Sequence, residues 1–257
     1  MISIMPKLTI PQIRDRKKQG PKLSVITAYD YPSARLVDAA GIDIILVGDS
    51  LGNVVQGKAT TLPVTVEEMI YHAEMVVRAA ANALVIVDLP FPHCQLGPKQ
   101  AVKTAAKILK KTLADGVKIE GGENRYHTIK AVVEAGIPVM GHCGLQPQKI
   151  KMLGRFALDR NAERLQADAN AIQDAGAFSM VLECMPADIA DQVSLSLNIP
   201  TIGIGAGPHC DGQVLVYHDL LGYNETAPKH VKVYAKLGQT ITEAVKQYCD
   251  DVQKGNF

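Results

Sequence analysis

Residues 84–120 read LVIVDLPFPHCQLGPKQAVKTAAKILKKTLADGVKIE, and this stretch contains the pattern that decides the fold. The apolar run Leu84–Val87 has the length and β-branched content of a buried strand. Pro98 can begin a helix with apolar residues at helical spacing, Gly116 is its expected end, and a second strand-like run follows at Val117–Ile119. A strand, a helix and a second strand in this order predict a βαβ unit of a parallel sheet.

The same alternation continues along the whole chain. Short apolar runs are separated by stretches with helical spacing, and their near-continuous hydrophobicity predicts strands that are covered on both faces. No G-x-G-x-x-G follows the first run, which favours a closed barrel over a dinucleotide-binding open sheet. We therefore predict one domain over residues 1–257, an α/β fold of the (β/α)8 TIM-barrel type. The eight predicted strands are Leu23–Thr27, Ile42–Val47, Leu84–Val87, Val117–Ile119, Pro138–Gly141, Met180–Leu182, Thr201–Ile204 and Val214–Tyr217.

The predicted helices have recognisable beginnings and ends. Thr65 and Glu68 form a capping-box pattern ahead of a regular apolar stripe. Gly41, Gly136 and Gly176 stand where helices are expected to stop. The segment up to residue 20 precedes the first strand, and we expect a helix there that either caps the barrel bottom or joins a neighbouring subunit. The other predicted helices span Tyr31–Ala40, Asn124–Ala135, Ala162–Ala175, Pro186–Leu197 and His230–Gln253.

Composition narrows the functional class. The chain has 27 Lys plus Arg and 26 Asp plus Glu, so its net charge of +1 gives no electrostatic attraction for nucleic acid or an anionic membrane. Its five scattered cysteines form no C-x-x-C pair, which argues against a disulfide framework and a structural zinc site. Apolar runs are too short to span a bilayer, and Pro6, Lys7 and Pro11 interrupt the start. We expect a cytoplasmic protein that acts on small molecules.

Ionisable residues recur where the predicted strands stop. In a barrel, the C-terminal ends of the strands meet at one mouth, where the active sites of such enzymes lie. Five successive strands, the second to the sixth, deliver ionisable groups to this rim. These groups are Asp49, Asp88, Lys118 with Glu120, His142 and Glu183.

Their chemistry suggests a metal-assisted reaction. Asp49, Asp88 and Glu120 could share one hard cation, because Mg²⁺ prefers carboxylate oxygens and water. Such a cation can chelate a 2-oxo acid and stabilise the enolate that forms when the acid loses a proton. Lys118 lies two residues before Glu120, so both side chains share one face of the strand, and its ammonium could bind the substrate carboxylate. Glu183 remains as a candidate general base.

Each of these residues also has a purely structural interpretation. Asp49 fits a helix cap or a turn, and Lys118 fits an internal ion pair with the acid on its own strand. His142, between two small residues, fits a satisfied core histidine, and Glu183 fits a surface or capping acid. The coincidence at five strand ends favours the functional interpretation.

Two further features lie after the predicted strands. The glycine-rich stretch GIGAG at 203–207 could wrap a phosphate, allow close approach to a bulky ligand, or form a tight turn with positive φ. His209, Cys210 and Asp211 follow it, and a loop explains them better than a thiolate metal site. Cys143 and Cys184 flank the predicted site, and we expect both to be packing groups rather than nucleophiles.

The motifs at the strand ends resemble those of the ketopantoate hydroxymethyltransferase family. The similarity extends from about Ile26 to Tyr248 and preserves the order of the motifs. They are VGDSLG at 47–52 with TLPVT at 61–65, DLPF at 88–91, VKIEGG at 117–122, GHCGL at 141–145 with PQ at 147–148, VLEC at 181–184, IGIGAG at 202–207 and DGQVLV at 211–216.

The resemblance implies hydroxymethyl transfer from 5,10-methylenetetrahydrofolate to 3-methyl-2-oxobutanoate, which gives 2-dehydropantoate for pantothenate and coenzyme A synthesis. It also implies Mg²⁺ held by Asp49, Asp88 and Glu120, with Glu183 as the proton acceptor. Members of the family are typically homo-oligomers, namely decamers. The oxo-acid pocket that the resemblance implies contains Asp49, Ser50, Asp88, Lys118 and His142.

Two segments depart from the family pattern. Pro92-His93-Cys94 replaces a small residue and Tyr after DLPF. The stretch 154–161, which begins with Gly154, lacks the further glycine that the family pattern has before the sixth helix. These departures leave the folate contacts and loop motion open. Two other interpretations of the whole chain are another Mg²⁺-dependent barrel, acting as a lyase or mutase on 2-oxo acids, and a noncatalytic ligand-binding barrel.

Overall fold

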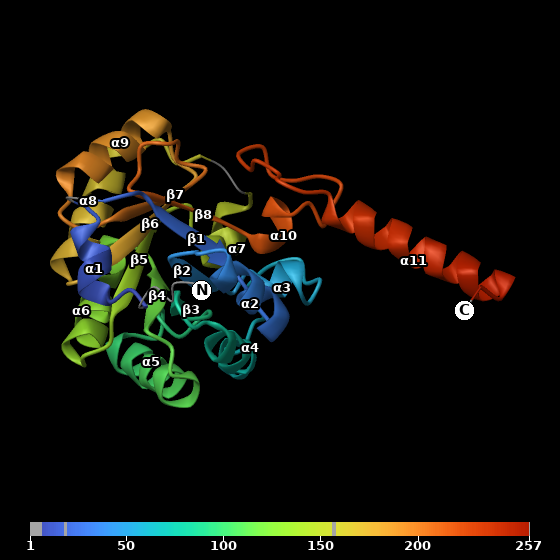
Figure 1. The fold of residues 1–257 in the computed structure, drawn as a ribbon. Helices are drawn as coiled ribbons and strands as arrows, with labels where there is room; N and C mark the ends of the chain where they lie inside the picture. Colours follow the sequence, from blue (N-terminus) through green and yellow to red (C-terminus); the bar gives the residue numbers. More distant parts are fainter. Residues whose placement is uncertain (1–6, 18–19, 156–157, 257) are drawn as a thin grey trace. The chain divides into compact units, whose positions relative to one another are not determined.

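The computed structural model describes residues 7–17, 20–155 and 158–256 (Figure 1). The chain forms two compact units, Met1–Val214 and Leu215–Phe257, which are described separately. The single domain expected over residues 1–257 stays a prediction. Within the described residues, no helix is both long enough and apolar enough to cross a membrane.

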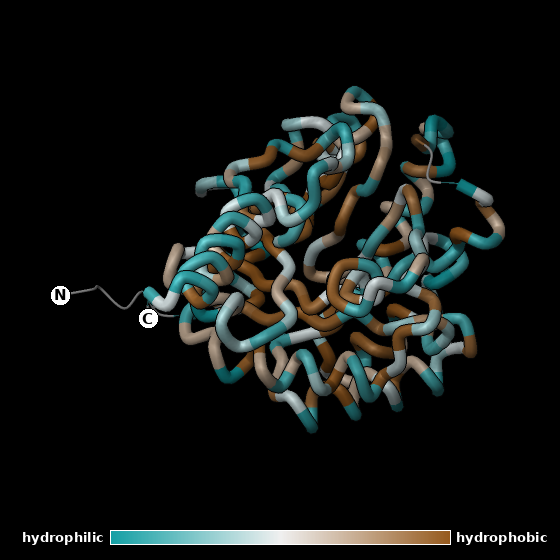
Figure 2. The backbone as a smooth tube through the Cα atoms, turned by 90° about the vertical axis from the view of Figure 1, so that its right-hand side faces the viewer, coloured by the Kyte–Doolittle hydropathy of each residue, from teal (hydrophilic) through white to brown (hydrophobic). Residues whose placement is uncertain are grey.

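Eight parallel strands close into a barrel in chain order, which confirms the predicted TIM-barrel fold. Helices alternate with the strands and lie outside them (Figure 1). Hydrophobic segments of the backbone gather inside this arrangement, as the brown stretches in Figure 2 show. The strands are β1 Leu23–Thr27, β2 Ile44–Val47, β3 Leu84–Asp88, β4 Gly116–Glu120, β5 Val139–Gly144, β6 Ser179–Glu183, β7 Thr201–Ile204 and β8 Gly212–Leu215.

Strands β3 to β6 continue past their predicted ends and include the polar residues that follow each apolar run. Pairing between neighbouring strands explains the extension, because Asp88 is in register with Lys118, and Glu120 with His142. Their backbones therefore belong to the ladder, although their side chains break the apolar pattern. The ionisable groups of β3 to β6 consequently stand on strands rather than on loops.

The eighth strand is the poorest of the strand predictions. It was expected over Val214–Tyr217, whereas β8 begins at Gly212 and Tyr217 already begins a short helix. A Cβ on Gly212 would lie 2.5 Å from the backbone oxygen of Leu23. The strand therefore begins where a glycine lets it approach β1 closely, which the apolar pattern does not reveal.

The helices of the first unit follow the sequence signals closely. The capping box is confirmed, because Thr65 N donates to Glu68 Oε2 at 2.7 Å and Glu68 N donates to Thr65 Oγ1 at 3.2 Å. Gly41, Gly136 and Gly176 have φ of +85°, +80° and +95° after their helices, as expected. The helices are α2 Tyr31–Ala39, α3 Leu51–Val54, α4 Val66–Ala79, α5 Pro98–Thr112, α6 Tyr126–Glu134, α7 Ile150–Leu153, α8 Ala162–Asp174 and α9 Ala187–Ser196, with 3-10 turns η1 Glu123–Arg125 and η2 Pro147–Lys149.

Helix α5 ends earlier than predicted. Gly116 was its expected end, but the helix stops at Thr112 and Leu113 takes the left-handed conformation, with φ of 62°. Thr112 Oγ1 accepts a hydrogen bond from Ala114 N at 3.1 Å, which helps to turn the chain out of the helix. Gly116 instead begins β4.

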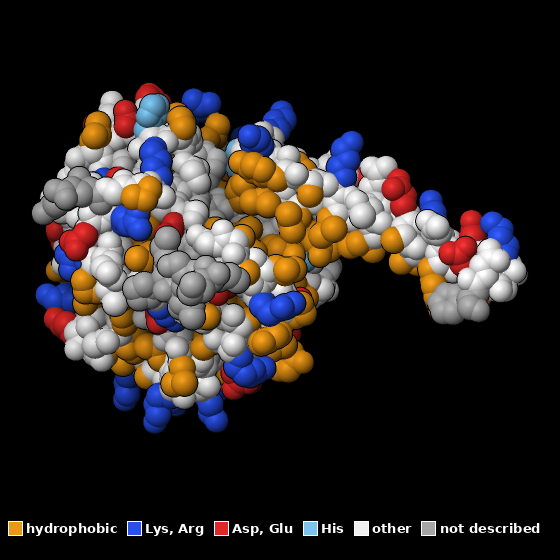
Figure 3. All heavy atoms as spheres, in the orientation of Figure 1, with side chains coloured by type: hydrophobic (Ala, Val, Ile, Leu, Met, Phe, Trp, Pro, Cys, Tyr) orange, Lys and Arg blue, Asp and Glu red, His pale blue; other side chains and the backbone are white. Residues whose placement is uncertain are grey.

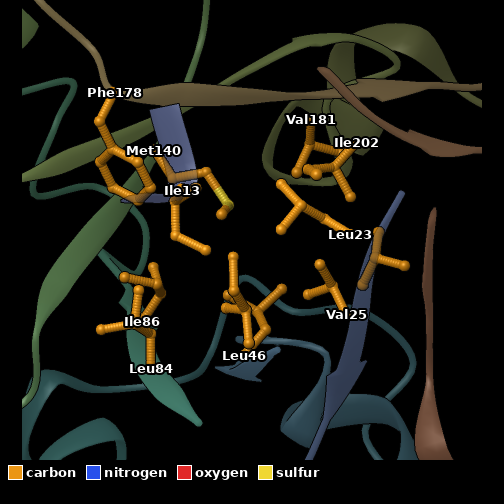
Figure 4. Packing of buried hydrophobic residues seen from close by; sticks show 12 residues of the cluster. Ile13, Leu23, Val25, Leu46, Leu84, Ile86, Met140, Phe178, Val181 and Ile202 are labelled. Carbon is orange, nitrogen blue, oxygen red and sulfur yellow. The ribbon is translucent and has the colours of Figure 1, made fainter. Parts of the chain in front are cut away.

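A short N-terminal helix, α1 Ile10–Asp15, closes the bottom of the barrel. Ile13 is fully buried and belongs to the same core cluster as Leu23, Leu84 and Phe178, which lie at or just before the first residues of their strands (Figure 4). This position confirms the capping alternative predicted for the N-terminal segment, as far as its described residues show. Residues 1–6 and 18–19 lie outside the described part of the chain.

The second unit contains α10 Tyr217–Leu220 and α11 Leu237–Lys254. The prediction of a helix from His230 was wrong for its first seven residues, 230–236. Backbone pairing explains the late start, because Tyr234 N donates to Leu220 O at 2.8 Å and Leu237 N donates to Leu221 O at 2.9 Å. The backbone just before α11 and at its first residue is therefore held by the end of α10.

Helix α11 has a hydrophobic face that this chain leaves exposed. None of its residues is buried, and an apolar side chain recurs every three or four positions along one side (Figure 3). Such a stripe is the seam that helices use to pack against one another. The stripe is formed by Ile241, Val245, Tyr248 and Val252, which are 45%, 55%, 56% and 50% exposed.

Candidate active site

The rim of the barrel gathers the ionisable residues predicted from the strand ends. Asp88 on β3 is in register with Lys118 on β4, and Glu120 on β4 is in register with His142 on β5. Glu183 is the last residue of β6. Because the strands are parallel, these residues stand at the same end of the barrel, opposite α1.

Asp49 and Ser50 join this group from the turn after β2. Asp49 N donates to Asp88 Oδ2 at 3.1 Å, which holds the turn against β3. A Cβ on Gly48 would lie 2.7 Å from Ser50 Oγ, so a glycine at this position leaves room for the serine hydroxyl. The structure thus brings the predicted Asp49, Ser50 and Asp88 together.

Tyr29 is a residue of this region that the sequence analysis missed. Its hydroxyl lies 2.8 Å from Ser50 Oγ, so it orients the serine. Burial raises the pKa of Tyr29 above its ordinary value, which keeps the hydroxyl protonated. The available signal was its place two residues after β1, the same strand-end position that identified the acids.

Lys118 forms a buried ion pair with the neighbouring strand. Its Nζ lies 2.9 Å from Asp88 Oδ1 and 3.4 Å from His142 Nδ1. Burial alone would lower the pKa of Lys118, but the charges of Asp88 and Glu120 outweigh burial and raise it above the ordinary value. The ammonium is therefore charged at neutral pH. Its ion-pair partner is Asp88 and not Glu120, the acid on its own strand that the structural interpretation had considered.

His142 connects the lysine to Glu183. An ammonium can only donate a hydrogen bond, so a bond between Lys118 and His142 requires Nδ1 as the acceptor and leaves Nε2 as the nitrogen that carries the ring proton. Nε2 lies 3.2 Å from Glu183 Oε2. That contact is not a well-aligned hydrogen bond among the described residues. A modest movement of Glu183 would align it.

The three acids share one buried region with little compensating charge. Asp49, Asp88 and Glu120 are 4%, 3% and 4% exposed. Burial, together with repulsion from Asp88, raises the pKa of Asp49 to about 7. Burial and the charge of Asp49 raise the pKa of Glu120 well above its ordinary range. Lys118 cannot neutralise all three, so the cluster favours protons or a cation.

The acid cluster has ligand atoms that suit a hard cation, but its side chains are not arranged around one cation position. Carboxylate oxygens are the preferred ligands of Mg²⁺. However, no three His, Cys, Asp or Glu side chains in the described ranges are already arranged around one cation position. A cation would therefore bind with small side-chain rotations.

Gln148 on η2 is a second residue that the sequence analysis did not single out. Its amide nitrogen donates to Asp49 Oδ2 at 2.9 Å, and its backbone nitrogen donates to Glu120 Oε2 at 3.2 Å. The residue appears in the sequence only as part of the PQ motif after β5, with no charge to mark it.

The cysteines and the glycine-rich stretch stand apart from this chemistry. Burial raises the pKa of Cys143 to about 12 and that of Cys184 to about 11, so both are thiols at neutral pH, as expected for packing groups. Gly205 and Gly207 have φ of 59° and 79°, which agrees with a tight turn after β7. Asp211 accepts hydrogen bonds from Lys17 and Thr201 at the start of β7, so it belongs to the frame of the barrel.

The first segment that departs from the family pattern lies in the loop between β3 and α5. His93 Nδ1 contacts Thr104 Oγ1 at 2.9 Å, and Cys94 is 1% exposed, so Pro92-His93-Cys94 is packed against α5 rather than projecting from the protein. The stretch 154–161 includes Phe156 and Ala157, which lie outside the described residues.

Comparison with known proteins identifies close relatives. The sequence pattern of the ketopantoate hydroxymethyltransferase family matches residues 7–257. The chain is 53% identical over 255 residues to 3-methyl-2-oxobutanoate hydroxymethyltransferase of Trichlorobacter lovleyi, covering 98% of this chain and 96% of the relative. It is 50% identical over 256 residues to the protein of that name from Moorella thermoacetica, covering 98% and 95%.

Solved structures show the same barrel at much lower identity. A 2,3-dimethylmalate lyase of the PEP mutase/isocitrate lyase superfamily aligns with a TM-score of 0.61 and 19% identity, over 97% of this chain and 89% of that one. A phosphonopyruvate hydrolase in complex with oxalate and Mg²⁺ aligns with a TM-score of 0.65 and 12% identity, over 96% and 88%. The lyases and hydrolases thus share the fold alone. The relatives from the ketopantoate hydroxymethyltransferase family match nearly the whole length of this chain and are identical to it at about half of the positions. This chain therefore belongs to the ketopantoate hydroxymethyltransferase family of enzymes.

Proposed function

We propose that this enzyme transfers a hydroxymethyl group from 5,10-methylenetetrahydrofolate to 3-methyl-2-oxobutanoate, giving 2-dehydropantoate for pantothenate and coenzyme A synthesis. The observation that carries the proposal is the family match over residues 7–257, combined with a rim where Lys118, His142 and three acids meet. The product is the 2-oxo acid with one new carbon on C3, so the reaction needs a base, a site for the oxo acid and a stabiliser of negative charge.

Glu183 is the proposed base. Its side chain is 17% exposed, whereas those of His142, Glu120 and Asp88 are 2%, 3% and 5% exposed, so Glu183 is the acid that an entering substrate reaches most easily. It takes the proton from C3 of the oxo acid, and the C3 carbanion, written as its enolate, then bonds to the methylene carbon of the folate in its iminium form. The bond between the methylene carbon and the folate nitrogen then breaks as water adds its oxygen to that carbon. Water loses one proton, the proton held by Glu183 passes to the folate nitrogen, and tetrahydrofolate leaves.

Ser50 and Lys118 are the proposed anchors of the oxo acid. The Lys118 ammonium offers the charge that a carboxylate needs, and the contact with Asp88 at 2.9 Å fixes its position. The Ser50 hydroxyl, oriented by Tyr29, can donate a hydrogen bond to an oxygen of the same acid. Asp49, Asp88 and His142 complete the proposed pocket, with Nε2 of His142 facing the base.

Asp49, Asp88 and Glu120 are the proposed holders of a divalent cation, which we take to be Mg²⁺. Their burial with one ammonium supports this role, because a buried excess of negative charge is costly unless something neutralises it. When bound, the cation supplies stabilisation of the negative charge that develops on the oxo oxygen. Rotation of the carboxylates would complete the site.

A homo-oligomer, and specifically the decamer typical of the family, is also part of the proposal. The apolar stripe on α11 supports self-association, because an exposed apolar surface of this kind marks an interaction site. The number of ten subunits rests on the family resemblance. A cytoplasmic location is proposed as well. All five cysteines are free, which suits a reducing compartment.

Substitution of the base tests the assignment. Glu183→Gln keeps the shape of the side chain but removes its basicity, so folate-dependent consumption of 3-methyl-2-oxobutanoate is expected to fall by about 100-fold or more. Glu163→Gln, on the exposed first turn of α8, is the matched control and should retain full activity. Turnover by the unmodified enzyme that proceeds equally well without folate would refute the transferase assignment and favour a lyase.

A further inference from the structure

Gln148 lies at the centre of the acidic rim without being an acid. It is 6% exposed and stands on η2, directly after the loop that follows β5. Its side-chain nitrogen donates to Asp49 Oδ2 at 2.9 Å and to Leu89 O at 3.0 Å. Its backbone nitrogen donates to Glu120 Oε2 at 3.2 Å. One residue thus contacts groups that follow or end β2, β3 and β4.

The direction of the Gln148 amide is fixed by its partners. Leu89 O is a backbone carbonyl oxygen and can only accept a hydrogen bond, so the NH2 group must face it, and the same group reaches Asp49 Oδ2. The carbonyl oxygen of the amide then faces outward and accepts from Gln95 Nε2 at 3.0 Å. Gln95 stands in the loop between β3 and α5, and it closes a chain of contacts from that loop through Gln148 to the acid cluster.

These contacts engage one oxygen of Asp49 and one of Glu120, whereas both oxygens of Asp88 have partners. Gln148 binds Oδ2 of Asp49 and Oε2 of Glu120, while Asp88 receives Asp49 N and Lys118. A hydrogen bond from a neutral donor to one oxygen restricts the rotation of a carboxylate and so favours one direction for its second oxygen. The neutral amide supplies this hold without adding a charge to the site.

We propose that Gln148 is a positioning residue that orients Asp49 for cation binding, and that Gln95 couples the loop after β3 to the same site by fixing the Gln148 amide. The inference rests on the proposed cation site at Asp49, Asp88 and Glu120. The structural alternative is that Gln148 only satisfies buried acceptors. The two differ in what happens to the affinity for the cation.

The test compares Gln148→Leu with the unmodified enzyme, using Mg²⁺ alone as the probe in calorimetric titration. Leucine has a similar size but removes all three side-chain hydrogen bonds, to Asp49, Leu89 and Gln95. The affinity for Mg²⁺ is expected to fall by about 10-fold to 100-fold. Gln95→Leu leaves Gln148 in place but removes the hydrogen bond to the side-chain carbonyl of Gln148. A smaller fall in the affinity for Mg²⁺ is therefore expected. Gln56→Leu is the matched control, because Gln56 Nε2 donates to Glu68 Oε1 at 2.9 Å outside the cluster. That variant should bind Mg²⁺ like the unmodified enzyme.

Crystal structures of metal-free Gln148→Leu and of the unmodified enzyme give a readout that does not depend on the metal. The backbone contact to Glu120 survives the substitution, so Asp49 is expected to change its side-chain orientation while Glu120 keeps its own. An unmoved Asp49, or an unchanged Mg²⁺ affinity in the variant, overturns the proposed role of Gln148. If the unmodified enzyme binds no Mg²⁺, the proposed cation site fails, and the orientation of Asp49 in the two crystals still decides the positioning role.

Discussion

Cation binding at the acid cluster is expected to depend on pH, because it must displace protons. The perturbation is a change from pH 6 to pH 8. With a pKa of about 7, Asp49 holds a proton in about nine molecules of ten at pH 6 and in about one of ten at pH 8. Mg²⁺ needs the ionised form, so binding should be about 10-fold tighter at pH 8 and should release about 0.9 proton per site at pH 6.

Glu120, the second acid with a raised pKa, makes the change of about 10-fold in affinity and the release of about 0.9 proton lower limits. The pKa of Glu120 is also raised, by burial first and then by Asp49, so its deprotonation adds to the same pH dependence. Calorimetric titration with Mg²⁺ in two buffers of different ionisation enthalpy measures both the affinity and the protons released. Asp49→Asn should remove about 0.9 proton from the release at pH 6. An affinity that is equal at pH 6 and pH 8, with no proton release, would refute the reasoning.

Four further predictions follow from the structure. Ile13→Ala should lower the free energy of unfolding by about 2–5 kcal/mol, measured in urea, and leave KM unchanged, because Ile13 packs at the opposite end of the barrel. Gly212→Ala should destabilise the enzyme by about 1–3 kcal/mol in the same assay, since the new Cβ would lie 2.5 Å from Leu23 O. Asp49→Asn should raise the thermal stability of the metal-free protein at pH 8 but not at pH 4. In the unmodified protein the folded state holds the Asp49 proton up to about pH 7, whereas the unfolded chain releases it near 3.8. The unmodified protein therefore loses stability as the pH rises between those values, and the asparagine variant avoids this loss. Val245→Glu on α11 should reduce the mass of the assembly in light scattering, whereas Gln247→Glu, away from the stripe, should not; equal masses for both variants would contradict packing through this helix.

The fold was predictable because two independent patterns agree. Apolar runs such as Leu84–Val87 mark strands, and signals such as the Thr65 and Glu68 capping box mark the helices between them. The errors fall where backbone contacts, not side-chain patterns, decide the structure. Gly212 begins β8 because it fits closely against β1, and Tyr234 pairs with Leu220 at the end of α10 instead of joining α11. Neither arrangement leaves a periodic signature in the sequence.

The charged residues of the candidate site could also be predicted from the sequence. Parallel strands bring their C-terminal ends together, so Asp88, Lys118 and Glu183 could be grouped from their positions alone. The positions of these residues at the strand ends do not predict which of them form an ion pair. Strand alternation linked Lys118 to Glu120, whereas the ammonium pairs with Asp88 on the neighbouring strand because the two residues are in register.

The residues that escaped prediction share a property. Tyr29 and Gln148 are both neutral and act through other side chains, the first on Ser50 and the second on Asp49. A charge at a strand end is informative by itself, because burying it is costly and demands an explanation. A buried amide or phenol needs only a hydrogen-bond partner, which could lie anywhere in the fold. Positioning residues of this kind therefore become visible only when the partners are known, and the acids that a sequence reveals are the right place to begin looking for them.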